Sequence, residues 1–356
     1  AHPVAAVAVP NPLGRTPMTR YALAWIHARS GDEAGAEAAL AEARAQPPDP
    51  FFPSRLHEQL VLEWALARGP DPLAGYALGN LLYDRRRHEE AIAAWERSAQ
   101  EGAPCATVHR NLGLALWNVR RDGPGAREAY AQARRHDPCD ARLLYELDQL
   151  RKKLDDPPAE RLAALEAERE LALERDDASV ELATLLNLCG RHGDALELLL
   201  SRRFHPWEGG EGAVLRQYRA ARLGLGRAAL EEGDAATALR HFEQALEPPP
   251  ELGEAWHPLQ ARADVSYWQG RALRDLGRED EARQRFEACA AESGDFTEMA
   301  VTAHGPLSWY RGLALRALGR EDEASALLTD LETFGRRGLE KPARIDYFAT
   351  SLPDLL

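Results

Sequence analysis

Small and aromatic hydrophobic residues recur at a fixed spacing along the chain. Gly79 is followed twelve residues later by Ala91, and Trp95 comes four residues after that. The series is repeated further along, with one additional residue before the alanine, in Gly113, Ala126 and Tyr130. This pattern predicts pairs of antiparallel helices that approach closely at the glycine and the alanine, while the aromatic ring fills the space toward the next pair.

The twelve-residue step from glycine to alanine recurs in the C-terminal half of the chain. The three further series are Gly226, Ala238 and Phe242; Gly270, Ala282 and Phe286; and Gly312, Ala324 and Leu328. A glycine, an alanine twelve residues later and a large side chain four residues after that resemble the pattern of the tetratricopeptide repeat, a helix–turn–helix unit of about 34 residues. The resemblance implies an all-α fold, a right-handed superhelical array of antiparallel helix hairpins. We assign residues 17–356 to about seven or eight such hairpins and residues 1–16 to a linker.

Two stretches, 49–71 and 141–175, are degenerate. In the first, Ser54 is expected to cap a helix that runs to about Arg68 and has no obvious second helix. In the second, residues 159–175 predict one long charged helix with Leu162 and Leu165 on a single face.

The repeat length changes along the array while the twelve-residue step does not. Equivalent positions lie 34 or 35 residues apart up to Ala183, and then 43, 44 and 42 residues apart through Gly226, Gly270 and Gly312. The added residues fall between one hairpin and the next, at about 204–212, 248–257 and 293–305. Because equivalent insertions in a solenoid emerge on one face, we expect these three segments to form a lip beside the groove.

Two phrases in this region suggest a second resemblance. Residues 202–212 (RRFHPWEGGEG) and 304–310 (HGPLSWY), together with the longer spacing, resemble the C-terminal repeat region of a bacterial family of unknown function. In that family the upstream half looks like a galactose-mutarotase-type β-sandwich. The resemblance implies a sugar-related context and an upstream β-sandwich domain as a partner, and it carries over no catalytic residue.

The first helix of each hairpin should line a concave groove. Aromatic, amide and guanidinium groups there suit an extended peptide or a sugar. The alternative interpretation is that tyrosine and asparagine are ordinary repeat residues packed between hairpins. The candidates are Tyr76, Asn80, Tyr83, Trp117, Tyr145, Asn187, Arg227, Tyr267, Arg271 and Trp309.

The lip carries an unusual set of side chains for connecting loops. Its candidate binding residues are His205, Trp207, Glu208, Glu211, His257 and His304, beside the aromatic residues Trp256 and Phe296. His205 and the two glutamates could also ligate a metal or act as acid and base. Since no further histidine pair supports such a site, we favour a structural or docking role and predict no metal, cofactor or catalytic residue.

Composition restricts the partners. A net charge of −13 argues against nucleic-acid binding, and no apolar run approaches the roughly 18 residues of a membrane span. Four cysteines without C-x-x-C spacing predict buried free thiols in a cytoplasmic protein. The last repeat ends without a polar capping helix, so its apolar face could pair two copies of the chain.

These observations favour a non-catalytic scaffold that binds a protein or peptide, or an adjacent domain, through the groove and the lip. The alternative is an accessory domain of a carbohydrate-active bacterial enzyme that contributes loop residues to a sugar site.

Overall fold

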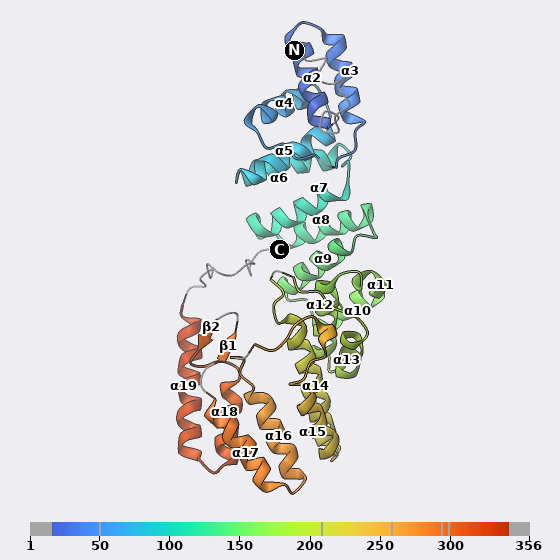
Figure 1. Ribbon diagram of the computed structural model, residues 1–356. Helices are drawn as coiled ribbons and strands as arrows, with labels where there is room; N and C mark the ends of the chain where they lie inside the picture. The colour runs from blue at the N-terminus through green and yellow to red at the C-terminus, as the bar shows by residue number, and fades with distance from the viewer. Residues whose placement is uncertain are drawn as a thin grey trace. The chain divides into compact units, whose positions relative to one another are not determined.

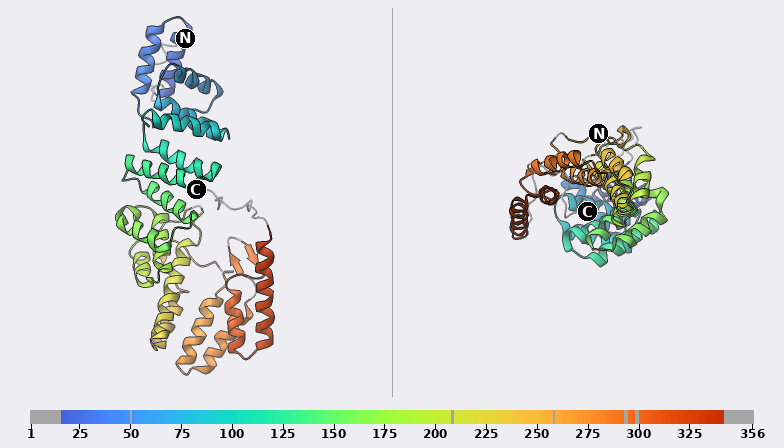
Figure 2. Two further views of the ribbon diagram at one scale, coloured as in Figure 1. Left: turned by 180° about the vertical axis from the view of Figure 1, so that it is seen from behind. Right: turned by 90° about the horizontal axis from the view of Figure 1, so that it is seen from below.

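The structure is a computed structural model that describes residues 16–49, 51–207, 209–257, 259–292, 295–297 and 300–341. The predicted linker therefore lies almost wholly outside the described residues, as does the end of the chain after residue 341. The chain divides into two compact units between Asp156 and Pro157. Each unit is built of antiparallel helices that pack side by side (Figures 1 and 2).

The described residues of the first unit form three helix hairpins and two single helices. The hairpins are α2 (Pro17–Arg29) with α3 (Glu33–Arg44), α5 (Pro72–Asp84) with α6 (His88–Gln100), and α7 (Ala106–Ala115) with α8 (Gly123–His136). The single helices are α4 (Leu56–Ala67), which contacts α2 and α5, and α9 (Ala141–Lys153), which contacts α8. The helix predicted without a partner at 54–68 is thus α4.

The second unit contains four hairpins. They are α12 (Asp176–Leu188) with α13 (His192–Leu200), α14 (Ala213–Glu231) with α15 (Ala235–Gln244), α16 (Ala263–Asp275) with α17 (Glu279–Ala291), and α18 (Ser308–Ala317) with α19 (Glu321–Leu339). The predicted all-α fold of stacked hairpins is confirmed. The long helix predicted at 159–175 is wrong: α10 (Pro158–Ala167) ends at Glu168, and a single turn, α11 (Arg169–Ala172), follows.

Contacts between a glycine and a large side chain of the same hairpin set the spacing within the hairpins, whereas the sequence predicted that the ring fills the space toward the next hairpin. The ring of Tyr130 lies so close to Gly113 that a Cβ atom there would come within 2.6 Å of its Cδ2 atom. Trp95 packs in the same way on Gly79, Phe242 on Gly226, and Leu328 on Gly312. The additional residue of the second series is absorbed by a π-helical turn, η2 (Leu116–Arg120), which lets the helix gain a residue without losing the contact.

Each turn between paired helices contains one residue in the left-handed backbone conformation, with positive φ. Glycine occupies this position in five of the seven hairpins, at Gly31, Gly190, Gly233, Gly277 and Gly319. Arg86 and Arg121 take it in the other two, with φ of 59° and 54°. Glycine adopts this conformation without a Cβ clash, so the two arginine turns are strained.

The three insertions differ in structure. The first is irregular and the second contains a short 3-10 turn, η3 (Pro250–Leu252). The third forms a two-stranded antiparallel hairpin, β1 (Asp295–Thr297) with β2 (Ala300–Thr302), in which Phe296 pairs with Val301.

None of the described helices combines the length and the apolar character that crossing a bilayer requires. All four cysteines are free. Cys289 is buried and burial raises the pKa of its thiol to about 12, whereas Cys139 is exposed, contrary to the prediction that every thiol is buried.

Candidate binding site

The first two insertions of the lip pack against each other in the second unit. The backbone N–H of Phe204 donates to the carbonyl of Glu251 at 2.9 Å, and that of Gly212 donates to Oε1 of Glu254 at 2.8 Å. The Phe204 side chain is fully buried and anchors the first segment. Gly253 has φ of 78°, and a Cβ atom there would come within 2.6 Å of the Phe204 carbonyl oxygen, so only glycine allows this approach.

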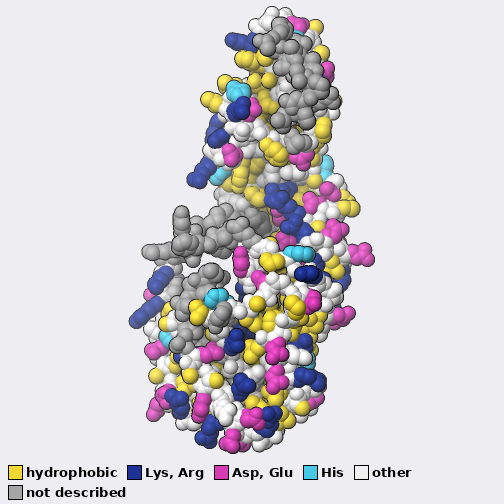
Figure 3. Space-filling model, in the orientation of Figure 1, with side chains coloured by type: hydrophobic (Ala, Val, Ile, Leu, Met, Phe, Trp, Pro, Cys, Tyr) yellow, Lys and Arg dark blue, Asp and Glu magenta, His cyan; other side chains and the backbone are white. Residues whose placement is uncertain are grey.

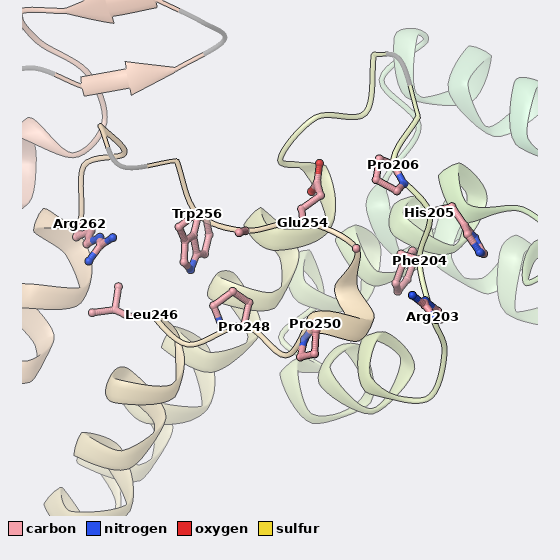
Figure 4. Close-up of a pocket in the computed structure, with 12 residues that line it drawn as sticks. Arg203, Phe204, His205, Pro206, Leu246, Pro248, Pro250, Glu254, Trp256 and Arg262 are labelled. Atoms are coloured by element: carbon pink, nitrogen blue, oxygen red, sulfur yellow. The ribbon is translucent and has the colours of Figure 1, made fainter.

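Between the two segments lies an open pocket of about 710 Å³ (Figure 4). Its walls are mainly proline, aromatic and aliphatic side chains, with arginines at its rim. It is lined by Arg203, Phe204, His205, Pro206, Leu246, Pro248, Pro250, Gly253, Glu254, Ala255, Trp256 and Arg262. The volume lies within the range of about 300–1,000 Å³ that is usual for ligand pockets.

Two polar atoms at this pocket are buried without a hydrogen-bond partner. They are Oε2 of Glu254, an acceptor, and Nε1 of Trp256, a donor. Burial raises the pKa of Glu254 above its ordinary value, although Gly212 N–H and Arg216 act in the opposite direction. Buried polar groups normally find partners, so these two atoms are unusual, but both are covered and Figure 4 shows the Glu254 carboxylate and the Trp256 indole nitrogen pointing away from each other.

The Trp256 ring is held from behind. The Arg219 guanidinium lies 5.5 Å from its centroid and also forms an ion pair of 2.9 Å with the buried Asp264. Burial raises the pKa of Asp264, which the Arg219 charge opposes. An arginine tied to a buried carboxylate keeps one face of the ring fixed.

The remaining residues of the first insertion lie mostly outside this pocket. The exposed His205 points away from its centre (Figure 4), and both its backbone N–H, at 2.9 Å, and its Nδ1, at 3.2 Å, contact Oδ2 of Asp176. Trp207 packs over Gly210 and lines a smaller neighbouring pocket of about 340 Å³. Glu211 is exposed and accepts from Gly209 N–H, while Glu208 lies outside the described residues.

The last two lip histidines lie apart from the first. His257 is exposed, and its Nδ1 accepts from Leu259 N–H at 3.2 Å. His304 lies beside Phe334 of α19, with ring centroids 5.6 Å apart and the rings tilted, and its Nδ1 is buried without a partner. The structure thus brings together the first and second insertions. Within the described residues, no group of three histidine, cysteine or acidic side chains is placed to hold a metal ion.

One groove candidate of the first unit, Asn80, belongs to a network of polar side chains that the sequence pattern did not single out. Asn80 accepts from Trp95 Nε1 and from Asn111 Nδ2, and Arg110 contacts Asn111 and binds Glu146 through two nitrogens at 2.8 and 2.6 Å. Burial favours a neutral Glu146, yet hydrogen bonds from Arg110 and Arg142 hold its pKa below the ordinary value.

The aromatic candidates of this unit are largely engaged in packing. Tyr76 is buried, so its ring offers little surface to a ligand. Tyr83 is half-buried between His88 and Trp95. Trp117 has its Nε1 buried without a partner beneath Arg121, and Tyr145 is half-buried.

Groove candidates in the second unit are split between core and surface. Tyr267 is buried and packs on Phe286, and its hydroxyl is 3.4 Å from Arg271. Asn187 is tied to Gln217 and His192. The guanidinium of Arg227 lies 5.3 Å from the centroid of the Trp268 ring. Trp309, which is 48% exposed, is the most exposed of the groove aromatics in the described chain.

For several residues of the pocket, nothing in the sequence predicts that they line a common site. Pro206, Pro248 and Pro250 lie in or beside the insertions, but nothing in their spacing indicates that they share a wall. Glu254 is one of many glutamates. Its importance comes from burial and from the Gly212 contact, which joins residues 42 apart in the sequence.

The tetratricopeptide repeat family model matches residues 59–105, 76–138 and 223–295. Among curated proteins, Cellulose synthase 1 operon protein C of Komagataeibacter xylinus is 34% identical over 76 residues, which make up 21% of this chain. The match spans only 6% of that relative's length. These matches do not test the resemblance to a family with an upstream galactose-mutarotase-like domain.

Three solved structures are similar at low identity. YrrB, described as a TPR protein with an unusual peptide-binding site, is 20% identical with a TM-score of 0.39, covering 54% of this chain and 93% of that one. The structure of Naa15/Naa10 bound to HypK-THB is 16% identical with a TM-score of 0.46, and the match covers 84% of this chain and 39% of that one. A tetratricopeptide repeat protein from Parabacteroides merdae is 13% identical with a TM-score of 0.32, covering 84% and 98%.

The family matches fall on α4 to α8 and on α14 to α17, where glycines lie against large side chains of the paired helices. Sequence pattern, hairpin packing and family matches agree that the chain contains tetratricopeptide repeats, with the matches at residues 59–138 and 223–295.

Proposed function

We propose that the chain is a non-catalytic interaction scaffold that holds an extended segment of a protein partner in the pocket between residues 203–206 and 248–256. Tetratricopeptide repeats are commonly protein-interaction scaffolds, which supports the general role. The segment can come from a separate protein or from another domain of the same protein, such as an upstream β-sandwich.

The observation that carries the proposal is the open, largely apolar pocket of about 710 Å³ between the two packed insertions. Glu254 Oε2 and Trp256 Nε1 are buried without partners, and a turn of their side chains would let them accept a peptide N–H and donate to a peptide carbonyl. The neighbouring Phe204, Pro206 and Pro248 suit an apolar side chain of the same segment. No nucleophile or metal ligand is needed for this role.

The test is peptide-array or phage-display selection on the whole chain, followed by calorimetry with the selected peptide. Glu254→Gln and Trp256→Phe should each weaken binding about tenfold or more, since each removes or alters one of the two hydrogen-bonding groups. Glu251→Gln is the matched control, because its exposed side chain lies three residues away and only its backbone carbonyl joins the two segments. Equal binding by all three variants would rule out the pocket as the site.

A carbohydrate ligand is the second candidate. An aromatic ring beside a carboxylate is an arrangement that also suits a sugar, and one relative is named after a cellulose synthase operon. A glycan array run in parallel separates the two, because a glycan that binds the wild-type chain and loses binding with Trp256→Phe, when no peptide is selected, would identify a sugar as the ligand of this pocket.

The groove residues are proposed as a second contact surface for the same partner. Asn80, Arg110 and Glu146 present polar groups along the first unit that could contact an extended chain. Arg110→Ala with Glu146→Ala, tested against the selected partner protein, distinguishes a partner that spans this surface from one held by the pocket alone.

A further inference from the structure

Two arginines at the rim of the pocket between the insertions have no acidic partner. Arg203 and Arg262 both line the pocket, and both are exposed. Within the described residues neither guanidinium forms an ion pair or a hydrogen bond, and only the backbone N–H of Arg262 donates to the Glu292 carboxylate. Figure 4 shows the two side chains at opposite ends of the pocket, with Pro248 and Trp256 between them.

Other arginines close to the pocket are paired, so these two guanidinium groups are a local exception. Arg202, directly before Arg203 in the sequence, binds Asp176 at 2.5 Å, and Arg219 of α14 binds the buried Asp264 at 2.9 Å. An arginine that already holds a carboxylate offers little charge to a ligand. An unpaired one can bind a carboxylate through two parallel hydrogen bonds, so both rim arginines are available to an acidic ligand.

The charge of the rim is not balanced inside the pocket. Glu254 is the one acidic residue among the described residues that line it, and its Oε1 accepts from Gly212 N–H while its Oε2 is buried. Figure 4 shows this carboxylate turned away from Pro248 and Pro250. The chain has a net charge of −13, and Figure 3 shows acidic and basic side chains interspersed on one face of the second unit. A pocket with a basic group at each end therefore differs from the rest of this surface and attracts negative charge.

We propose that the segment held in this pocket is acidic, with an apolar residue at its centre and a carboxylate on each side, one for Arg203 and one for Arg262. This inference rests on the proposed function, because it specifies the partner of the same pocket. The apolar residue packs on the proline and aromatic side chains that lie between the two arginines. Charges at a rim mainly speed association and select the partner, so binding should weaken as the salt concentration rises.

Three synthetic peptide libraries test the proposal on the whole chain. Each peptide has a leucine or phenylalanine at its centre, flanked on both sides by glutamate in the first library, glutamine in the second and lysine in the third. Fluorescence anisotropy should show that the glutamate library binds about tenfold more tightly than the glutamine library, and that the lysine library binds most weakly. Sodium chloride should reduce this difference, because it screens exposed charges. Equal binding of the glutamate and glutamine libraries would overturn the proposal.

Removal of the two rim charges locates the effect. Arg203→Gln with Arg262→Gln should abolish the preference for glutamate and leave both the helicity and the binding of the glutamine library unchanged, because both side chains are exposed. Arg240→Gln with Arg283→Gln is the matched control, since it removes two exposed arginines of α15 and α17 that form no ion pair in the described chain. The control should keep the preference. An equal loss in the control would assign the preference to net charge and exclude the rim arginines.

Charge reversal gives a result that a merely destabilised chain cannot give. Arg203→Glu with Arg262→Glu should invert the order of the libraries and favour lysine. A double variant that gains no preference for lysine would contradict the direct contacts.

The Trp256→Phe variant separates this inference from the proposed function. If it weakens binding of all three libraries while the wild-type chain shows no preference among them, the pocket holds a peptide and the acidic segment is excluded. If Trp256→Phe and Glu254→Gln leave the binding of every library unchanged, the pocket is not the peptide site, and the proposed function fails together with this inference.

Discussion

The ring of Phe286 lies directly on Gly270, so close that a Cβ atom at Gly270 would come within 2.6 Å of the Phe286 Cε1 atom. The two residues are sixteen apart in the sequence and belong to the two helices of one hairpin. The same relationship joins α5 to α6, α7 to α8 and α14 to α15, so this contact sets how closely paired helices approach.

Replacing Gly270 by leucine should destabilise the second unit by about 1–3 kcal/mol, because the added side chain forces α16 away from α17. Urea unfolding followed by circular dichroism measures the change. Gly335→Ala is the control, since Gly335 lies within α19 with open space at its Cβ position. That substitution should stabilise the helix by about 0.5–1 kcal/mol. Equal effects would contradict the packing role of Gly270.

Truncating the other partner should have a larger effect. Phe286→Ala removes a fully buried ring and should lower the free energy of unfolding by about 3–5 kcal/mol. Phe334→Ala removes a ring that is about half exposed and should cost clearly less. Thermal unfolding of the two variants side by side checks the difference, and a small effect of Phe286→Ala would place the ring outside the core.

The strained turn at Arg86 should be improved by glycine. Arg86→Gly relieves a left-handed arginine and should stabilise the first unit by about 1 kcal/mol. The reverse change, Gly277→Ala, puts a Cβ atom on a residue with φ of 73° in open space and should cost about the same. Denaturant unfolding should show a higher free energy of unfolding for Arg86→Gly and a lower one for Gly277→Ala. If both substitutions lower it, the fold needs the Arg86 side chain.

Asp156 should make the first unit sensitive to acid. Hydrogen bonds from Arg127, at 2.9 and 2.8 Å, and from Arg151, at 2.8 Å, hold the pKa of its carboxyl well below the ordinary value. A lowered folded pKa stabilises the protein above the unfolded value of about 3.9, and the effect is lost as the pH falls below it. The stability difference between wild type and Asp156→Asn should therefore stay constant from pH 6 down to about pH 4 and shrink as the pH falls further. A constant difference would contradict the ion pairs.

Glu254 should show the opposite dependence. Because burial raises its folded pKa, its contribution to stability is full below the unfolded value of about 4.3 and is lost as the pH rises through the folded value. Glu254→Gln should thus be at least as stable as wild type at neutral pH and lose that advantage in acid. Urea midpoints at several pH values test this. A destabilised variant at neutral pH would mean that the ionised carboxylate is needed by the fold.

The sequence by itself determined the hairpins, because their packing depends on residues twelve and sixteen apart along one chain segment. Gly226, Gly270 and Gly312 could be placed at the contact between paired helices without a structure, and the family matches cover the first two, but the packing of Phe242, Phe286 and Leu328 on these glycines came from the structure. Local spacing also located the unpaired helix at Ser54 to Arg68 and the three insertions, since each interrupts a regular period.

Only the tertiary structure decided what the irregular parts do. The π-helical turn at Leu116–Arg120 absorbs an added residue that the spacing revealed without showing how, and the break at Glu168 contradicts a continuous helical pattern. The pocket depends on Phe204 and Gly212 meeting Glu251 and Glu254, contacts between segments more than forty residues apart. Burial without a hydrogen-bond partner, as at Glu254 Oε2 and Trp256 Nε1, is a property of the surrounding packing, and no periodicity in the chain encodes it.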